Sequence, residues 1–287
     1  MLAVAGVRLA YLAIRTAARS WVQRWFVIAG DGPVAMALSG MLAAALAHSS
    51  SMVEVLALGL VQTEGLPMAH ALYVIIGANV GTTLTAQLVA LQLPSVGIGM
   101  MAVGAGGYLL SRQREFSLAL FSIGAFLQGM EWIGRSLGPL ATGVLGAVEG
   151  SNSVLRAFGL GWLVTSLIQS STTVTTSVVN MVAAGLMETR PGVAAVLGSN
   201  VGTVTTGLVA SLFMGRGATR LAMADFFLNL VGAAVALVLF RPFHDLVTSL
   251  AGSAAQSVAH AHTLFNLLSA LVSFPLVPKM ARWLEGR

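Results

Sequence analysis

The chain has no cysteine and few charged residues, and both shortages narrow its class. Without cysteine it has no disulfides and no thiolate metal sites. Charged residues make up only 9% of the chain, whereas a soluble domain usually carries about 25%. That composition leaves too little polar surface for a water-soluble fold, but a lipid bilayer accepts an apolar surface. The sequence therefore indicates an integral membrane protein.

Hydrophobic residues make up 56% of the 287 residues. In a membrane this length predicts an all-α fold of roughly eight to ten spanning or half-spanning segments, at about 20 residues per span. The first 24 residues carry four spread arginines with no short apolar core after them, so we expect no cleavable signal peptide. No basic run lies in a polar segment, which disfavours a nucleic-acid partner. The net charge of +5 is explained by basic residues, which keep loops on the cytoplasmic side of a membrane.

Two motifs recur at one offset of 121 residues. AHSSSMV at 47–53 matches IQSSTTV at 168–174, and GANVGTTLT at 77–85 matches GSNVGTVTT at 198–206. We therefore predict two structural repeats and a C-terminal helical segment at 241–287. The first repeat covers 1–115, with a hairpin at 34–62 and the GANVGTT helix at 68–91. The second covers 116–240, with a hairpin at 154–187 and the GSNVGTV helix at 192–214.

The relative orientation of the repeats depends on how many spans separate them. An even number preserves orientation and an odd number inverts it, and the spans around 116–150 are ambiguous in the sequence. Interrupted apolar segments at matching positions are typical of inverted-repeat transporters. We therefore expect inverted repeats, each with a re-entrant helical hairpin and a broken or unwound helix.

Hydroxyl residues interrupt both predicted hairpins, at Ser49, Ser50 and Ser51 and at Ser170, Ser171 and Thr172. One such run could bond back to its own helix or pack closely against another. Two copies, each followed by the same glycine motif, favour hairpins that break inside the membrane. A half-helix that starts there presents free N–H groups and partial positive charge. Together with the hydroxyls, these groups could bind an anion.

The glycine motifs allow two interpretations. Two glycines four apart permit close helix packing. Glycine also costs about 1 kcal/mol in a helix interior, so the motif suits local unwinding that exposes carbonyl oxygens. With Asn79, Asn200 and the threonine hydroxyls, these oxygens would be hard ligands for a small cation, which is the interpretation we favour. The pattern is not GxGxxG within a βαβ unit, so dinucleotide binding is excluded.

On these paired motifs the chain resembles the type II sodium–phosphate cotransporters and their short bacterial members. The matching residues are HSSS at 48–51, QSST at 169–172 and the two glycine motifs, and AHAHTLFN at 259–266 is also similar to bacterial members. The resemblance implies that both hairpins meet near the membrane centre and bind phosphate with several sodium ions. It places Ser49, Ser50, Ser51, Ser170, Ser171 and Thr172 near phosphate or sodium. It assigns sodium coordination to Gln169, Asn79, Asn200, Thr82, Thr203, Thr85 and Thr206.

The resemblance further implies sodium-coupled symport of inorganic phosphate by a multi-pass protein of the bacterial inner membrane. It implies no cofactor beyond sodium as the coupling ion, and no enzymatic activity. The sequence does not decide whether the protein forms a homodimer. Many bacterial relatives carry a soluble regulatory domain after the last span, and we expect none in this short chain.

Three residues depart from the family pattern. His48 replaces a glutamine, Glu54 replaces a small or hydroxyl residue, and Asp225 stands where bacterial relatives often have histidine. Acids inside a membrane are expensive and are functional candidates. Glu54 and His48 could form a satisfied pair, or they could bind a cation or carry a proton, since histidine titrates near neutral pH.

Proton-coupled transport, transport of another oxyanion, and a non-transporting scaffold or sensor therefore stay open. A membrane enzyme is disfavoured, because Ser49 adjoins His48 in sequence and the second repeat lacks both histidine and glutamate at the matching positions.

Overall fold

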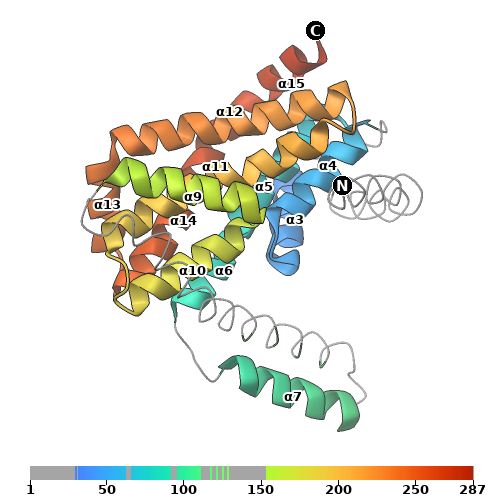
Figure 1. Cartoon of the computed structure of the whole chain (residues 1–287). Coiled ribbons are helices and arrows are strands. Elements are labelled where there is room, and N and C mark those ends of the chain that lie inside the picture. The colour runs from blue at the N-terminus through green and yellow to red at the C-terminus, as the bar shows by residue number, and fades with distance from the viewer. Residues whose placement is uncertain are drawn as a thin grey trace.

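We analysed a computed structural model of the chain (Figure 1), which describes residues 30, 32–62, 66–91, 96–110, 117, 121, 125, 128 and 153–286. All regular structure in these residues is helical, which confirms the predicted all-helical class. Four helical stretches are long and apolar enough to cross a membrane: Met68–Ala90, Thr189–Ser211, Arg216–Val238 and Ala254–Glu285. Four shorter apolar helices accompany them. The chain is therefore a multi-pass membrane protein.

The first half begins with α3 (Pro33–Ala47) and α4 (Ser50–Gln62), which are separated by two residues. Proline at the first position of α3 suits a helix start, because its missing N–H would have no partner there. Next come α5 (Met68–Gly81), α6 (Thr83–Ala90) and α7 (Val96–Leu110). α7 lies apart from the other labelled helices, at the lower edge of Figure 1.

The second half contains α9 (Val154–Ile168), α10 (Ser171–Ala183), α11 (Thr189–Ser211) and α12 (Arg216–Val238). The Ser153 hydroxyl caps α9 by accepting the N–H of Arg156. The chain ends in α13 (Phe240–Ser249), α14 (Ala254–Ser273), the 3-10 helix η3 (Phe274–Leu276) and α15 (Val277–Glu285). α14 packs against α5 and α6 of the first half and against α10, α11 and α12 of the second, so it lies between the two halves.

Glycines let α3 pack directly on α5, and α9 on α11. A side chain on Gly77 would overlap the carbonyl oxygen of Ala37, and one on Gly198 would overlap that of Phe158. Both residues of the second pair lie 121 positions after those of the first. The same correspondence relates two further pairs: Gly40 with Val74 to Gly161 with Ala195, and Gly81 with Met41 to Gly202 with Trp162.

The prediction that the glycine motifs break or unwind their helices is wrong for the second motif, whereas α5 and α6 meet at a short interruption in the first. α11 continues without interruption through 198–204. In the first half, Thr82 separates α5 from α6 but keeps right-handed helical dihedrals, with φ −66° and ψ −19°. The glycines are needed for close approach to a neighbouring helix, which was the other interpretation of the motif. Because the backbone of α11 stays helical, the second motif does not offer the expected free carbonyl oxygens.

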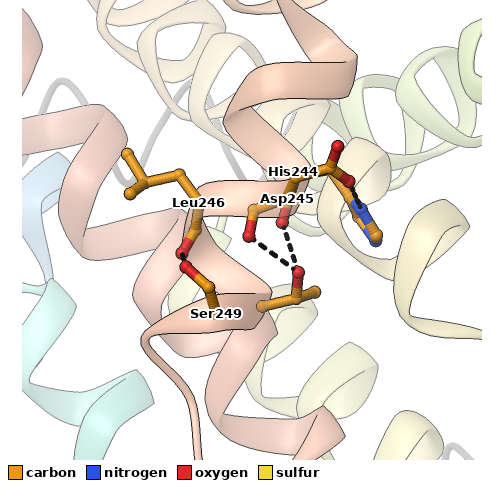
Figure 2. Close-up of polar contacts among 5 residues, drawn as sticks. His244, Asp245, Leu246 and Ser249 are labelled. Atoms are coloured by element: carbon orange, nitrogen blue, oxygen red, sulfur yellow. Dashed lines mark hydrogen bonds and ion pairs between the residues drawn. The ribbon is translucent and has the colours of Figure 1, made fainter.

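α13 carries polar side chains at the end of the bundle away from α3 and α4 (Figure 1). His244 contacts Asp245 at 3.3 Å, and Ser249 donates to the carbonyl of Leu246 at 2.8 Å, as Figure 2 shows. Thr248 donates to the carbonyls of His244 and Asp245. These groups bond within their own helix, and Asp245 and Ser249 are exposed, so they provide matched controls for buried residues of the same type.

Candidate functional site

Both halves contain a helix break at the equivalent residue. His48 ends α3 with φ 53°, and Gln169 ends α9 with φ 60°. Among the described residues these are the non-glycine positions with positive φ, and they lie 121 residues apart. A left-handed conformation costs a non-glycine residue about 1–2 kcal/mol. Such local strain is typical of functional sites, so the breaks mark the first candidate region.

The hydroxyl triplets begin the helices that follow these breaks. Ser49 Oγ accepts the N–H of Met52 and Ser170 Oγ accepts the N–H of Thr173, each at 3.2 Å. The first residue of each triplet therefore caps its own helix. The next two N–H groups of each helix precede the first intrahelical bond and can donate elsewhere. These N–H groups belong to Ser50, Ser51, Ser171 and Thr172, which are all buried.

The two breaks meet in space. Thr172 Oγ1 donates to the main-chain carbonyl of His48 at 3.1 Å. His48 Nδ1 lies 3.0 Å from Thr85 Oγ1 on α6, and α6 also packs on α10. The structure thus brings the paired helix starts together with one of the predicted sodium ligands. They touch directly, and neither cavity described below lies between them.

The threonines and the glutamine among the remaining predicted sodium ligands have different surroundings. Thr82 and Thr203 donate to the carbonyls of Asn79 and Ser199 in their own helices, a common use of a hydroxyl inside a helix. Gln169 is exposed. Thr206 Oγ1 is buried and has no hydrogen-bond partner among the described residues, so it is a candidate still able to take a ligand.

A second polar cluster surrounds Asp225. Asn79 Nδ2 donates to Asp225 Oδ1 at 3.4 Å. Asn229 Nδ2 donates to the same oxygen at 3.0 Å and to the Asp225 carbonyl at 2.9 Å. A cavity of about 20 Å³ adjoins these groups and is also lined by Asn266. Asp225 was noted in the sequence as a departure and as an acid that is a functional candidate, but its partners were not predicted and Asn229 was missed.

Asn266 extends this cluster to the second glycine motif. Its Nδ2 donates to Asn200 Oδ1 at 3.0 Å and to the carbonyl of His262 at 2.8 Å. Each asparagine of a glycine motif therefore bonds to a polar residue of a later helix: Asn79 to Asp225 of α12, and Asn200 to Asn266 of α14. The sequence carried a signal for this pairing. ADFFLN at 224–229 and AHTLFN at 261–266 share the spacing A-x4-N, with a polar residue four positions before the asparagine on the same helix face.

Glu54 is buried on α4, and its carboxyl group fills the space beside Gly207 where a side chain would lie. It forms no hydrogen bond with His48, and its Oε1 has no partner among the described residues. The interpretation of Glu54 and His48 as a satisfied pair is therefore wrong, since His48 bonds Thr85 instead. α4 packs on α12, the helix that carries Asp225.

A separate cavity of about 760 Å³ lies between α12, α14 and α15. Its lining is mainly apolar, with Met223, Phe227 and Leu268 among the side chains, and it contains none of the predicted site residues. An apolar lining suits hydrocarbon rather than an oxyanion, so this cavity is not the candidate phosphate site.

Charge-poor helices, paired breaks and buried polar residues define a helical membrane protein with an internal polar site. The chain belongs to the Na+/Pi-cotransporter family, whose model matches it twice in succession, at residues 2–135 and 136–265.

Several named proteins are similar to the chain. An uncharacterised Bacillus subtilis protein, YqeW, is 26% identical over 95% of this chain and 91% of its own length. YjbB of Escherichia coli, named as a proposed inorganic phosphate export protein, is 24% identical over 85% of this chain and 46% of its own length. Sodium-dependent phosphate transport protein 2A of sheep is 33% identical over 41% of this chain and 14% of its own length. The chain thus spans less than half of the latter two relatives. No solved structure matches it.

Proposed function

We propose that this protein is a secondary active transporter that moves inorganic phosphate together with sodium across the bacterial inner membrane. Family membership and the names of two relatives support phosphate as the substrate. The observation that carries the proposal is the contact between Thr172 and His48, which joins two hydroxyl-bearing helix starts from different halves of the chain.

Phosphate binding would use the donors that the breaks create. The N–H groups and hydroxyls of Ser50, Ser51, Ser171 and Thr172 form two helix N-termini, and each such end favours an anion. Sodium ions on oxygen ligands such as Thr85 and Thr206 would offset the negative charge of the substrate. No fixed cation is needed under this scheme. If net charge moves, the membrane potential adds about 2.3 kcal/mol per charge per 100 mV.

The two halves would be inverted repeats whose hairpins enter from opposite faces of the membrane. The shared break, the shared serine cap and the shared glycine packing at one offset support an equivalent fold for both halves. Transport would alternate access by moving one half against the other. Because the breaks now touch, phosphate entry requires Thr172 and His48 to separate.

Coupling to protons is the second candidate. Glu54 is buried with an unpartnered oxygen beside the break region, and a protonatable acid there could replace one sodium ion. The name of the Escherichia coli relative concerns phosphate export, so the direction of net transport also needs measurement. An inward sodium gradient would drive uptake by a symporter.

Uptake of radiolabelled phosphate by purified protein in proteoliposomes tests these proposals. Liposomes receive an inward sodium gradient, an inward proton gradient in potassium, or no gradient. We expect the wild type to take up phosphate with the sodium gradient and not under the other two conditions. In a Ser50→Ala/Ser171→Ala double variant, sodium-driven uptake should be at least about tenfold slower, equivalent to about 1.4 kcal/mol. Ser249→Ala, exposed and bonded within α13 (Figure 2), is the matched control. Uptake driven only by protons, or unchanged in the double variant, contradicts the proposal.

A further inference from the structure

Asp225 is a buried acid that is only half satisfied. The residue is 2% exposed. Asn79 and Asn229 both donate to Oδ1, whereas Oδ2 has no partner among the described residues. The described residues also provide no basic partner, because the ion pair found among them joins His244 and Asp245. A buried carboxylate without compensation is unstable in the fold, so Asp225 must either hold a proton or face a cation at Oδ2.

A cavity lies beside this carboxylate. Its volume is about 20 Å³, enough for one water-sized particle, since about 10–15 Å³ is required. Polar residues from three helices line it: Asn79 of α5, Asp225 and Asn229 of α12, and Asn266, Ser269 and Ser273 of α14. These three helices contact one another pairwise, so a particle here would bridge both halves of the chain.

The asparagine side chains around the cavity use their NH₂ groups as donors elsewhere, so their amide oxygens can bind a particle in the cavity. Asn229 and Asn266 each donate Nδ2 to a main-chain carbonyl four residues earlier, which fixes the amide orientation, because a carbonyl accepts only from the NH₂ group. Nδ2 of Asn79 donates to Asp225. Carbonyl-type oxygens, a carboxylate and serine hydroxyls are hard ligands, which suit alkali and alkaline-earth cations.

The charge of the ligand set favours a monovalent ion. Asp225 is the single carboxylate lining the cavity. Within the described ranges no group of three or more histidine, cysteine, aspartate or glutamate residues could hold a metal ion. Glu54 does not line the cavity. One carboxylate with neutral oxygens balances one unit of positive charge.

We infer that this cavity is a sodium site in which Asp225 supplies the charge and Asn79, Asn229 and Asn266 supply neutral oxygen ligands. The inference deepens the proposed sodium-coupled transport and rests on it. It differs from the ligand set expected from the sequence, of which it keeps only Asn79. The ion would tie α5, α12 and α14 together, and it would explain how an acid is tolerated at this depth.

Melting of the purified full-length protein in phosphate-free buffer tests the site. Sodium is titrated against potassium at constant ionic strength. We expect sodium, but not potassium, to raise the melting temperature, because a ligand that binds only the folded state stabilises it. Asp225→Asn should raise the half-saturating sodium concentration at least tenfold. Asp245→Asn, the same change at an exposed position of α13 (Figure 2), should leave it unchanged.

Should Asp225→Asn not fold, Ser273→Ala removes one cavity hydroxyl more gently and should still weaken the sodium response several-fold. The inference is overturned if the wild type responds equally to both ions, if stabilisation follows pH instead of sodium, or if Asp225→Asn and Ser273→Ala keep the wild-type response. Phosphate uptake is measured in parallel. If the wild type shows sodium-driven phosphate uptake but Asp225→Asn keeps the wild-type melting response to sodium, only the sodium site at Asp225 is contradicted. If sodium binding depends on Asp225 but the wild type takes up no phosphate, only the transport proposal is contradicted.

Discussion

Thr172 of α10 donates its hydroxyl hydrogen to the main-chain carbonyl of His48, which lies 124 residues earlier in the chain. The accepting carbonyl belongs to a residue held in a left-handed conformation at the end of α3. The donor lies in the first turn of a helix that follows the equivalent break. One hydrogen bond therefore connects the two left-handed helix breaks, at His48 and Gln169.

Removing that hydroxyl should loosen the contact between the breaks. Thr172→Val keeps the shape of the side chain and leaves the His48 carbonyl without this donor, which we expect to cost about 1 kcal/mol of stability. The melting temperature and the rate of sodium-driven phosphate uptake should both fall in Thr172→Val. Thr172→Ser, which keeps a hydroxyl, should retain part of both. Thr248→Val loses a hydroxyl bonded within α13 and should leave uptake unchanged. Wild-type uptake by Thr172→Val would show that this contact has no role in transport.

Glycine-to-alanine changes should separate close packing from backbone flexibility. Gly77→Ala and Gly198→Ala place a methyl group against a carbonyl of the neighbouring helix, and we expect each to destabilise the protein by about 1–3 kcal/mol. Gly159→Ala lies in α9 with open space around it. It should be neutral or stabilising by about 0.5–1 kcal/mol. Chemical denaturation of the three variants measures the difference, and equal effects at all three positions would contradict the packing role.

Glu54 and Gly207 should behave as a coupled pair. Their equivalents 121 residues away are Thr175 and Ala86, so a glutamate with a glycine in one place corresponds to a smaller threonine with a larger alanine in the other. Gly207→Ala alone should clash with the Glu54 carboxyl group and destabilise the protein. Adding Glu54→Thr should recover most of that loss, giving a coupling free energy above about 1 kcal/mol in a double-mutant cycle. Strictly additive melting shifts would show that the two residues do not share the space.

His48 should be replaceable by the residue that its counterpart uses. Gln169 occupies the same left-handed conformation, so His48→Gln should fold and should keep sodium-driven phosphate uptake. Histidine is the side chain that most readily gains or loses a proton near neutral pH, so a proton-carrying role for His48 would make wild-type uptake depend on pH and make the variant insensitive to it. We expect the same pH profile for both proteins, measured as initial rates in proteoliposomes.

The sequence was sufficient to predict the helical membrane class and the positions of the interruptions. Composition alone excluded a soluble fold, and the hydroxyl triplets coincide with the starts of α4 and α10. These features are local, because an amphipathic or apolar pattern and a capping serine act within a few residues of their own position. The family resemblance, carried by motifs at one offset, is confirmed by the match of the family model over both halves.

The role of the glycine motifs and the cluster around Asp225 could not be predicted in the same way. Whether Gly198 unwinds a helix or admits a neighbour depends on Phe158, 40 residues earlier, which approaches only in the folded chain. The cluster likewise joins Asn79 to Asp225 across 146 residues. Such long-range pairs leave no periodic signal, although the repeated A-x4-N spacing pointed to the two helix faces involved.

A crystal structure of the protein with sodium and arsenate would locate the substrate itself. Arsenate shares the charge and tetrahedral shape of phosphate, and its heavy atom can be placed by anomalous scattering. We expect one arsenic peak between the two helix starts, within hydrogen-bond distance of Ser50 or Ser51 and of Ser171 or Thr172. Arsenate bound only elsewhere, with the two helix starts still in direct contact, would contradict the proposal that the paired breaks form the phosphate site.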